Sequence, residues 1–277
     1  MQKRILTIQD YSSLGRCSLT VALPIISSMQ IEAVGLPTAI LSNHTAFPSF
    51  DFVDLTSSME SFVSKWDGFN NSFDTIYTGY LAKGQADIVL NIINKLKKEN
   101  TKVLIDPAFA DSGKLYPGFD LNHVNDMKKL VSISDFLVPN LSEACFLTGT
   151  EYDLNNSELN YIVINKLLDE GAKNVILTGV RKENKVGCLF KNKQEEFFYG
   201  SIDLHTKFHG TGDVFASALA SCLTLNLSNQ EAIKTAHDFV TLAMEKTIED
   251  EVNGMLYGPE FEKALYLLTE KSKEYNK

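Results

Sequence analysis

Short apolar segments alternate along the chain with longer segments whose apolar residues recur at helical spacing. Val103-Leu104-Ile105 is typical of a strand buried on both faces, whereas Ile88, Ile92 and Leu96 lie on one side of a helix predicted at residues 85–98. Strands are expected at residues 5–8, 31–41, 75–78, 103–105, 136–138, 174–178, 186–190 and 195–199, the last two as an antiparallel pair. Helices are expected at residues 19–29, 54–65, 85–98, 157–169, 212–225, 229–247 and 259–270.

This alternation predicts an α/β fold of three layers, an α/β/α sandwich in which helices cover both faces of a mostly parallel sheet. No linker rich in proline, glycine or serine and no internal repeat divides the chain, so residues 1–277 are expected to form a single domain. Residues 31–50 are expected to add a small flap of strands.

Polar residues and glycines follow several of the predicted strands directly. They are Asp10, Gly79, Asp106, Asn140 and Gly179. Ligands of open parallel sheets bind beyond the carboxyl ends of the strands. We therefore expect these five residues to line one edge of the sheet.

The most specific motif is Gly210-Thr211-Gly212-Asp213, which precedes an apolar helix. The glycines let a ligand approach the backbone, and the N–H groups at a helix N-terminus attract an anion. A carboxylate beside such an anion site can take the proton of an attacking alcohol, as phosphoryl transfer to a hydroxyl requires. Spacing alone slightly favours the simpler interpretation, a glycine-rich loop in which Asp213 caps the helix.

Two further segments carry carboxylates after predicted strands. Asp106 and Asp111 flank a loop that could bind a metal or a cationic ligand, although its proline, serine and glycine are also typical of a turn. Asn140 and Glu143 could orient water around Mg²⁺, although the same pattern is typical of a helix cap. Ser42-Asn43-His44-Thr45 is a polar cluster that carries little information by itself.

Composition limits the classes of function. The formal net charge of −9 argues against a nucleic-acid-binding protein, because binding to phosphates needs a basic surface. No segment approaches the 18 apolar residues of a membrane span, and the four cysteines show no disulfide or zinc spacing. We therefore expect a cytoplasmic protein with reduced thiols and no membrane partner.

Taken together, the motifs resemble the ribokinase-like superfamily and, within it, the pyridoxal (vitamin B6) kinases. The resemblance covers most of the chain, in order: Thr7-Ile8-Gln9, Ser42-Asn43-His44-Thr45, Thr78-Gly79-Tyr80, Asp106-Pro107 with Asp111, Gly113, Leu115 and Tyr116, Pro139-Asn140 with Glu143, Thr178-Gly179, and Gly210-Thr211-Gly212-Asp213. The last element marks the superfamily, and the Ser-Asn-His-Thr and Thr-Gly-Tyr elements point to B6 kinases.

The resemblance implies a kinase that transfers the γ-phosphoryl group of ATP to the 5′-hydroxymethyl group of a B6 vitamer. It also implies Mg²⁺, commonly a monovalent cation, and a homodimer. Asp213 would be the base, with Gly210, Thr211 and Gly212 as the anion hole. The remaining roles implied are the pyridine pocket for Asp10, Thr45 and Tyr80, ATP binding for Asp106, Asn140, Thr178 and Gly179, and the metal for Asp111 and Glu143.

Some positions depart from the family pattern. Asp10 stands where many B6 kinases have serine, and a carboxylate there favours a cationic partner such as a protonated ring nitrogen or the amine of pyridoxamine. Phe109 and Ala110 differ from the usual residues of the Asp-Pro loop, and His209 replaces the cysteine found in some relatives. A hydroxymethylpyrimidine kinase and a non-catalytic vitamer-binding protein remain alternatives, while a sugar kinase fits Asn43-His44-Thr45 and Tyr80 less well.

Overall fold

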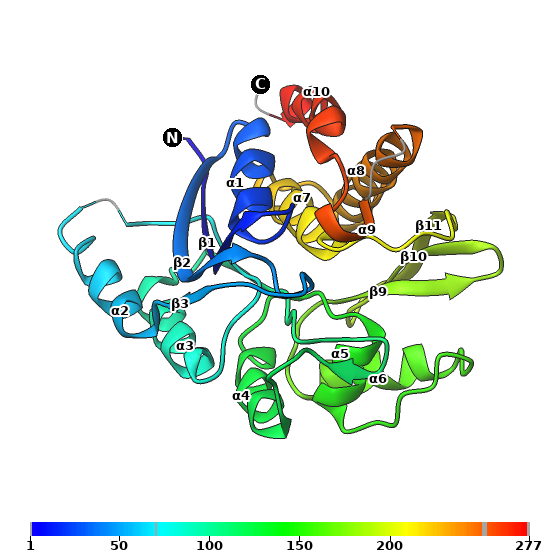
Figure 1. Cartoon of the computed structure of the whole chain (residues 1–277), viewed down its shortest axis with the longest axis horizontal. Coiled ribbons are helices and arrows are strands. Elements are labelled where there is room, and N and C mark those ends of the chain that lie inside the picture. The colour runs from blue at the N-terminus through cyan, green and yellow to red at the C-terminus, as the bar shows by residue number, and fades with distance from the viewer. Residues whose placement is uncertain (1, 70, 251–253, 276–277) are drawn as a thin grey trace.

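A nine-stranded sheet forms the centre of the computed structural model, which describes residues 2–69, 71–250 and 254–275 (Figure 1). Its strands in spatial order are β11 (Glu196–Ile202), β10 (Lys185–Lys191), β9 (Val175–Lys182), β8 (Phe136–Leu137), β5 (Lys102–Ile105), β4 (Thr75–Thr78), β1 (Arg4–Leu14), β2 (Glu32–Asn43) and β3 (Phe52–Asp54). Strands β2, β1, β4, β5, β8 and β9 run parallel, whereas β3, β10 and β11 pair antiparallel. A two-stranded ribbon, β6 (Ala110–Asp111) with β7 (Lys114–Leu115), lies apart from it.

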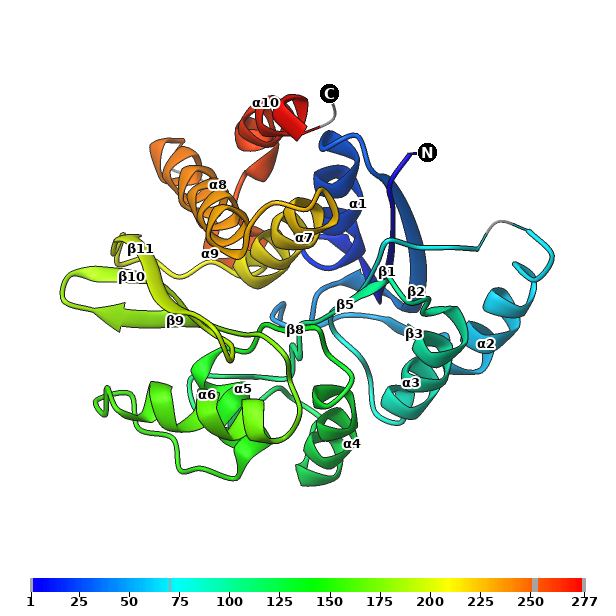
Figure 2. The same cartoon turned by 180° about the vertical axis from the view of Figure 1, so that it is seen from behind.

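Helices cover both faces of this sheet. One face carries α1 (Leu19–Ser28), α7 (Thr211–Thr224), α8 (Asn229–Glu249), α9 (Gly254–Tyr257), the 3₁₀ turn η1 (Phe261–Ala264) and α10 (Leu265–Tyr275). The opposite face carries α2 (Thr56–Ser64), α3 (Gln85–Leu96), α4 (Leu121–Val131), α5 (Leu141–Thr148) and α6 (Leu159–Asp169) (Figure 2). The predicted α/β sandwich with a mostly parallel sheet is confirmed.

The sheet divides the apolar core into two layers because successive strand residues point to opposite faces. Ile5 and Leu104 pack with α1, α7 and α8, while their neighbours Leu6 and Ile105 pack with the helices of the other face. Strands buried on both sides show no polar alternation, which is why their sequences are continuously apolar.

Two predicted strand ends were wrong. β1 continues past Asp10 to Leu14, with a change of register against β2 between Gln9 and Tyr11. β9 likewise continues past Gly179 to Lys182 and pairs there with β10 across another register shift. A β-bulge redirects a side chain without ending the strand. A polar residue or a glycine in the sequence therefore does not show whether the strand ends there or continues past a bulge.

The region expected as a flap extends the main sheet. β2 pairs with β1 over most of its length, and β3 adds a short antiparallel strand at the sheet edge. No described helix has the length and apolar content to cross a membrane.

Candidate active site

The predicted site residues follow the order of the strands along the carboxyl edge of the sheet. Gly179 belongs to β9, Asn140 follows β8, Asp106 follows β5, Tyr80 follows β4 and Asp10 lies on β1. The residues predicted for the nucleotide therefore lie on one side of this edge and those predicted for the acceptor on the other. The first turn of α7 lies between these two sides, since the charge of its Asp213 raises the pKa of both Asp10 on β1 and Asp106 after β5.

The first turn of α7 is shaped by two glycines with different constraints. Gly210 is the N-cap with φ of 78°, and a Cβ there would lie 2.0 Å from the carbonyl oxygen of Arg16. Gly212 has open space, because the nearest atom to a Cβ would be Asp106 Oδ2 at 4.0 Å. Thr211 donates its hydroxyl to the carbonyl of Phe208 over 3.3 Å. Gly210 is thus required by the fold, whereas Gly212 leaves room between the helix end and Asp106.

Asp213 is buried in this first turn and is held by a segment from far away in the chain. Its Oδ2 accepts the backbone N–H of Ser18 at 3.0 Å and the thiol of Cys17 at 3.1 Å. Burial raises the pKa of Asp213 above its ordinary value, while these two hydrogen bonds act in the opposite direction. A carboxylate with a raised pKa is a better proton acceptor for an alcohol.

Asp10 lies near Asp213 on the acceptor side. It is 3% exposed, and the hydroxyls of Ser12 and Ser18 donate to its two oxygens. Burial raises the pKa of Asp10 to about 6, and the charge of Asp213 adds to the rise. None of the hydrogen bonds described at Asp10 comes from a cationic side chain, so a cationic ligand would be favoured beside it.

Tyr80 shares this side of the site. Its ring stacks on Phe119 with centroids 5.6 Å apart. Burial and then the charge of Asp10 raise the pKa of Tyr80 to about 12, which places the phenol within electrostatic range of Asp10. Thr45 lies in the turn after β2, beside the buried His44, and none of the described hydrogen bonds joins it to Asp10 or Tyr80. The structure thus brings Asp10 and Tyr80 together, and the role of Thr45 stays a prediction.

On the other side, Glu143 forms the capping box of α5. Its carboxylate accepts the N–H groups of Asn140 at 2.9 Å and Phe109 at 3.1 Å, and Asn140 caps the N–H of Glu143. The helix-cap interpretation is therefore correct for this pair. Burial nevertheless raises the pKa of Glu143 to about 8. Burial and the charges of Glu143 and Asp213 raise the pKa of Asp106 well above its ordinary value.

These buried carboxylates suit a divalent cation. Burial raises the pKa of both Asp106 and Glu143, so a bound cation would favour their charged forms, and hard oxygen donors are the ligands of Mg²⁺. Within the described ranges no three His, Cys, Asp or Glu side chains form a ready metal-binding group. Both oxygens of Glu143 already accept N–H groups, and Asp111 is exposed on β6, where it accepts the N–H of Ser112. The residues fit Mg²⁺ that keeps most of its waters.

Thr178 and Gly179 lie where β9 passes the end of the parallel sheet. The N–H of Thr178 donates to the carbonyl of Pro139, and Gly179 has φ of 70° with open space where a Cβ would lie. A cavity of about 190 Å³ borders Gly179 and is also lined by Leu141, Leu154 and Arg181. This space adjoins the nucleotide side of the edge.

The residues that sequence analysis did not assign to the site come from the turn before α1. Cys17 and Ser18 hold Asp213, and Ser12 and Ser18 hold Asp10. Tyr116, to which the family resemblance gives no role, also lies here, because burial and the charges of Glu143 and Asp106 raise its pKa. No sequence signal marks the contacts of Asp213, because they join segments about 200 residues apart.

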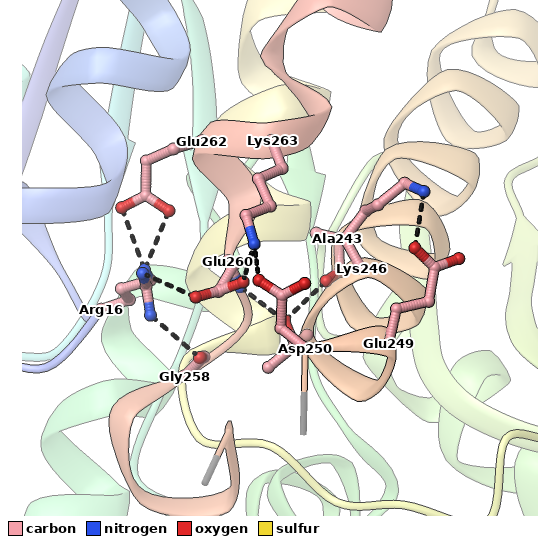
Figure 3. Close-up of polar contacts among 10 residues, drawn as sticks. Arg16, Ala243, Lys246, Glu249, Asp250, Gly258, Glu260, Glu262 and Lys263 are labelled. Carbon is pink, nitrogen blue, oxygen red and sulfur yellow. Dashed lines mark hydrogen bonds and ion pairs between the residues drawn. The ribbon is translucent and has the colours of Figure 1, made fainter. Parts of the chain in front are cut away.

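The turn before α1 is itself anchored to the C-terminal segment of the chain. Arg16 pairs with Glu262 at 2.9 Å and Glu260 at 3.8 Å, as Figure 3 shows, and its backbone N–H donates to the carbonyl of Tyr257. Gly258 packs so closely on Arg16 that a Cβ there would lie 2.9 Å from the Arg16 side chain. The turn that positions Asp213 is therefore braced from outside the site.

Comparison with known proteins gives a consistent result. The family model described as phosphomethylpyrimidine kinase matches residues 57–257. A solved Bacteroides thetaiotaomicron structure, assigned as a phosphomethylpyrimidine kinase and containing pyridoxal, is 33% identical, with a TM-score of 0.91 and coverage of 97% of this chain and 96% of that one.

Two curated relatives represent the two kinase activities that the sequence left as alternatives, one relative for each. A pyridoxal kinase of Dictyostelium discoideum is 26% identical and is matched over 79% of this chain and 78% of its own length. A hydroxymethylpyrimidine/phosphomethylpyrimidine kinase of Haemophilus influenzae is 25% identical, over 87% and 91%. The predicted resemblance to these kinases is confirmed. Because the family model matches more than half of the chain, the chain belongs to the phosphomethylpyrimidine kinase family.

Proposed function

We propose that this protein phosphorylates the 5′-hydroxymethyl group of a vitamin B6 vitamer with ATP. The observation that carries the proposal is the place of Asp213, which lies within electrostatic range of both Asp10 and Asp106 at the start of α7. A relative named pyridoxal kinase and a similar structure that contains pyridoxal support the choice of substrate.

In this proposal the acceptor alcohol meets Asp213, which removes its proton as the oxygen attacks the γ-phosphorus and the bond from that phosphorus to the departing ADP breaks. The N–H groups of Thr211 and Gly212 face the developing charge, because the open space at Gly212 admits the phosphoryl group. Asp10 and Tyr80 hold the pyridine ring, with Thr45 as a further candidate contact. This places the 5′-hydroxymethyl group toward α7.

The nucleotide would occupy the other side of the edge. Thr178 and Gly179 would contact it beside the cavity, and Asp106 and Asn140 would lie near its phosphates. Mg²⁺ would be held through its waters by Asp106, Asp111 and Glu143, where it would neutralise phosphate charge. A monovalent cation remains part of the proposal on the resemblance alone.

A coupled assay of ADP release tests the proposed function directly. We expect turnover with pyridoxal, pyridoxine or pyridoxamine, and loss of turnover when EDTA removes Mg²⁺. Because Asp10 favours a cationic ligand, we expect kcat/KM to be higher for pyridoxamine than for pyridoxal. In the variant Asp10→Ser this difference in kcat/KM should become smaller. Turnover with none of the three vitamers would contradict the proposal.

The same assay separates the two alternatives. A hydroxymethylpyrimidine kinase would turn over the pyrimidine faster than any vitamer, and the Haemophilus influenzae relative makes this the main competitor. A non-catalytic vitamer-binding protein would bind pyridoxal without releasing ADP. The buried, hydrogen-bonded Asp213 argues against the second alternative, since a mere binding site has no need of a desolvated base.

We also propose that the protein is a homodimer that buries the open face near the β3 edge. Tyr11, Ile40 and Val53 lie side by side on β1, β2 and β3, and they are 41%, 44% and 56% exposed. A row of apolar side chains across three strands is typical of an interface. Light scattering is expected to give twice the chain mass, and Val53→Lys to shift it toward the monomer. The control Ile202→Lys, at the opposite edge of the sheet, should leave the mass unchanged, and a monomeric wild type would refute the interface.

A further inference from the structure

Ser18 has a backbone conformation that residues with a Cβ rarely adopt. Its φ is 54° and its ψ is −132°, immediately before the first residue of α1. Strained residues of this kind persist where the surrounding structure holds them, and they concentrate at functional sites. The strain at Ser18 therefore raises the question of what its conformation achieves.

Ser18 also gives up the usual role of a serine at a helix start. A serine at the N-cap normally accepts a hydrogen bond from the first turn with its side-chain oxygen, but Ser18 makes no such bond. Its hydroxyl instead donates to Asp10 Oδ1, and its backbone N–H donates to Asp213 Oδ2 at 3.0 Å. One residue thus contacts both buried carboxylates, which come from β1 and α7.

The neighbours of Ser18 hold this conformation from both sides. The carbonyl of Cys17 accepts the hydroxyl of Thr20 at 2.7 Å, and the backbone N–H of Arg16 donates to the carbonyl of Tyr257. The side chain of Arg16 pairs with Glu260 and Glu262 (Figure 3). The carbonyl of Arg16 also lies against Gly210 of the anion site. The turn is therefore held on several sides, and it joins the acceptor side of the site to the start of α7.

We propose that Ser18 is a positioning residue that fixes Asp10 and Asp213 relative to each other, so that a substrate bound at Asp10 presents its alcohol to Asp213. This inference rests on the proposed function. Ser18 need not touch the substrate, because it acts through the two carboxylates. Misplacement of reacting groups by about 1 Å can cost about 100-fold in rate, so a device that sets their separation is of direct catalytic value.

The first test is Ser18→Gly, which removes the hydroxyl and relieves the backbone strain. We expect kcat/KM for the vitamer to fall at least about 10-fold, while the Tm stays the same or rises. If Ser18 had only a structural role, kcat/KM would change in the same direction as the Tm. Gln30→Gly is the matched control, because Gln30 has φ of 62° at the other end of α1, is exposed, and lies outside the site. It should leave activity unchanged.

The second test asks whether Ser18 acts through Asp10. In a double-mutant cycle, Ser18→Ala should lower kcat/KM in the wild type and have little further effect in an Asp10→Asn background. Ser12→Ala removes the other hydroxyl that donates to Asp10. Its kcat/KM shows how much activity is lost when Asp10 loses a hydrogen bond that does not come from Ser18. Full additivity of Ser18→Ala and Asp10→Asn would overturn the inference.

The pH dependence of kcat/KM is a third test, because a loss of packing alone would not shift it. The hydroxyl of Ser18 stabilises the charged form of Asp10, whose pKa is about 6, and Asp213, Tyr80 and Cys17 are the other titratable groups that interact with it. Without that hydroxyl the pKa of Asp10 rises, so the acid limb of kcat/KM should move to higher pH in Ser18→Ala. An unmoved limb with wild-type kcat/KM would refute the role of Ser18 alone, whereas a wild type that phosphorylates no vitamer would refute the proposed function.

Discussion

Replacement of Asp213 by alanine is expected to lower kcat by at least about two orders of magnitude, a typical contribution of a general base. The carboxylate is buried, burial raises its pKa, and it sits between the acceptor and nucleotide sides of the site. Asp213→Asn should lose as much, because the amide keeps the size of the side chain but cannot take a proton. Steady-state kinetics with saturating ATP and vitamer measure both variants.

Two controls keep this result interpretable. The vitamer should still bind to Asp213→Asn in calorimetry, and the Tm should show that the variant is folded, since Asn can still accept the N–H of Ser18. A folded Asp213→Ala protein with nearly wild-type kcat would remove the base assignment. It would also remove the reason for placing the alcohol at α7.

Gly210→Ala is expected to be the most destabilising single change at the site. The added Cβ would lie 2.0 Å from the carbonyl oxygen of Arg16, and alanine is unfavourable at φ of 78°. Overpacking and the left-handed backbone together should lower the free energy of unfolding by about 2–4 kcal/mol. Urea denaturation measures this loss, and turnover should fall with it because the turn that holds Asp213 is displaced.

Gly212→Ala is the matched control two residues away. A Cβ there meets only Asp106 Oδ2 at 4.0 Å, so stability should remain close to that of the wild type. Its turnover should nevertheless fall, because the methyl group enters the space that the phosphoryl group needs. Unchanged turnover in a stable Gly212→Ala variant would show that phosphate does not approach the start of α7 there.

Much of this fold follows from local pattern in the sequence. Continuous apolar runs such as Val103-Leu104-Ile105 mark strands buried on both faces, and a helical repeat marks α3. α4 was not predicted, although Asp120 caps it and Val124, Met127 and Val131 are buried along it. Its helical spacing was present, but the polar residues between these positions weakened the pattern.

Part of the candidate site could likewise be predicted from local features of the sequence. Asp106, Asn140 and Gly179 could be placed on one edge from the sequence, because the ends of parallel strands meet there whatever the details of packing. The motif at Gly210–Asp213 was likewise visible, because a helix start with glycines is a local feature.

The way in which the carboxylates are held could not be predicted without the folded chain. Ser18 meets Asp213 across 195 residues of sequence, in a backbone conformation that nothing in its local sequence favours. The bulges at Asp10 and Gly179 also depend on the strands beside them. The layers of the fold could be predicted from the local periodicity of the chain, and the residue types available for chemistry are set by its composition. The positions of proton donors and acceptors depend on contacts between distant segments, and these exist only once the sheet has assembled.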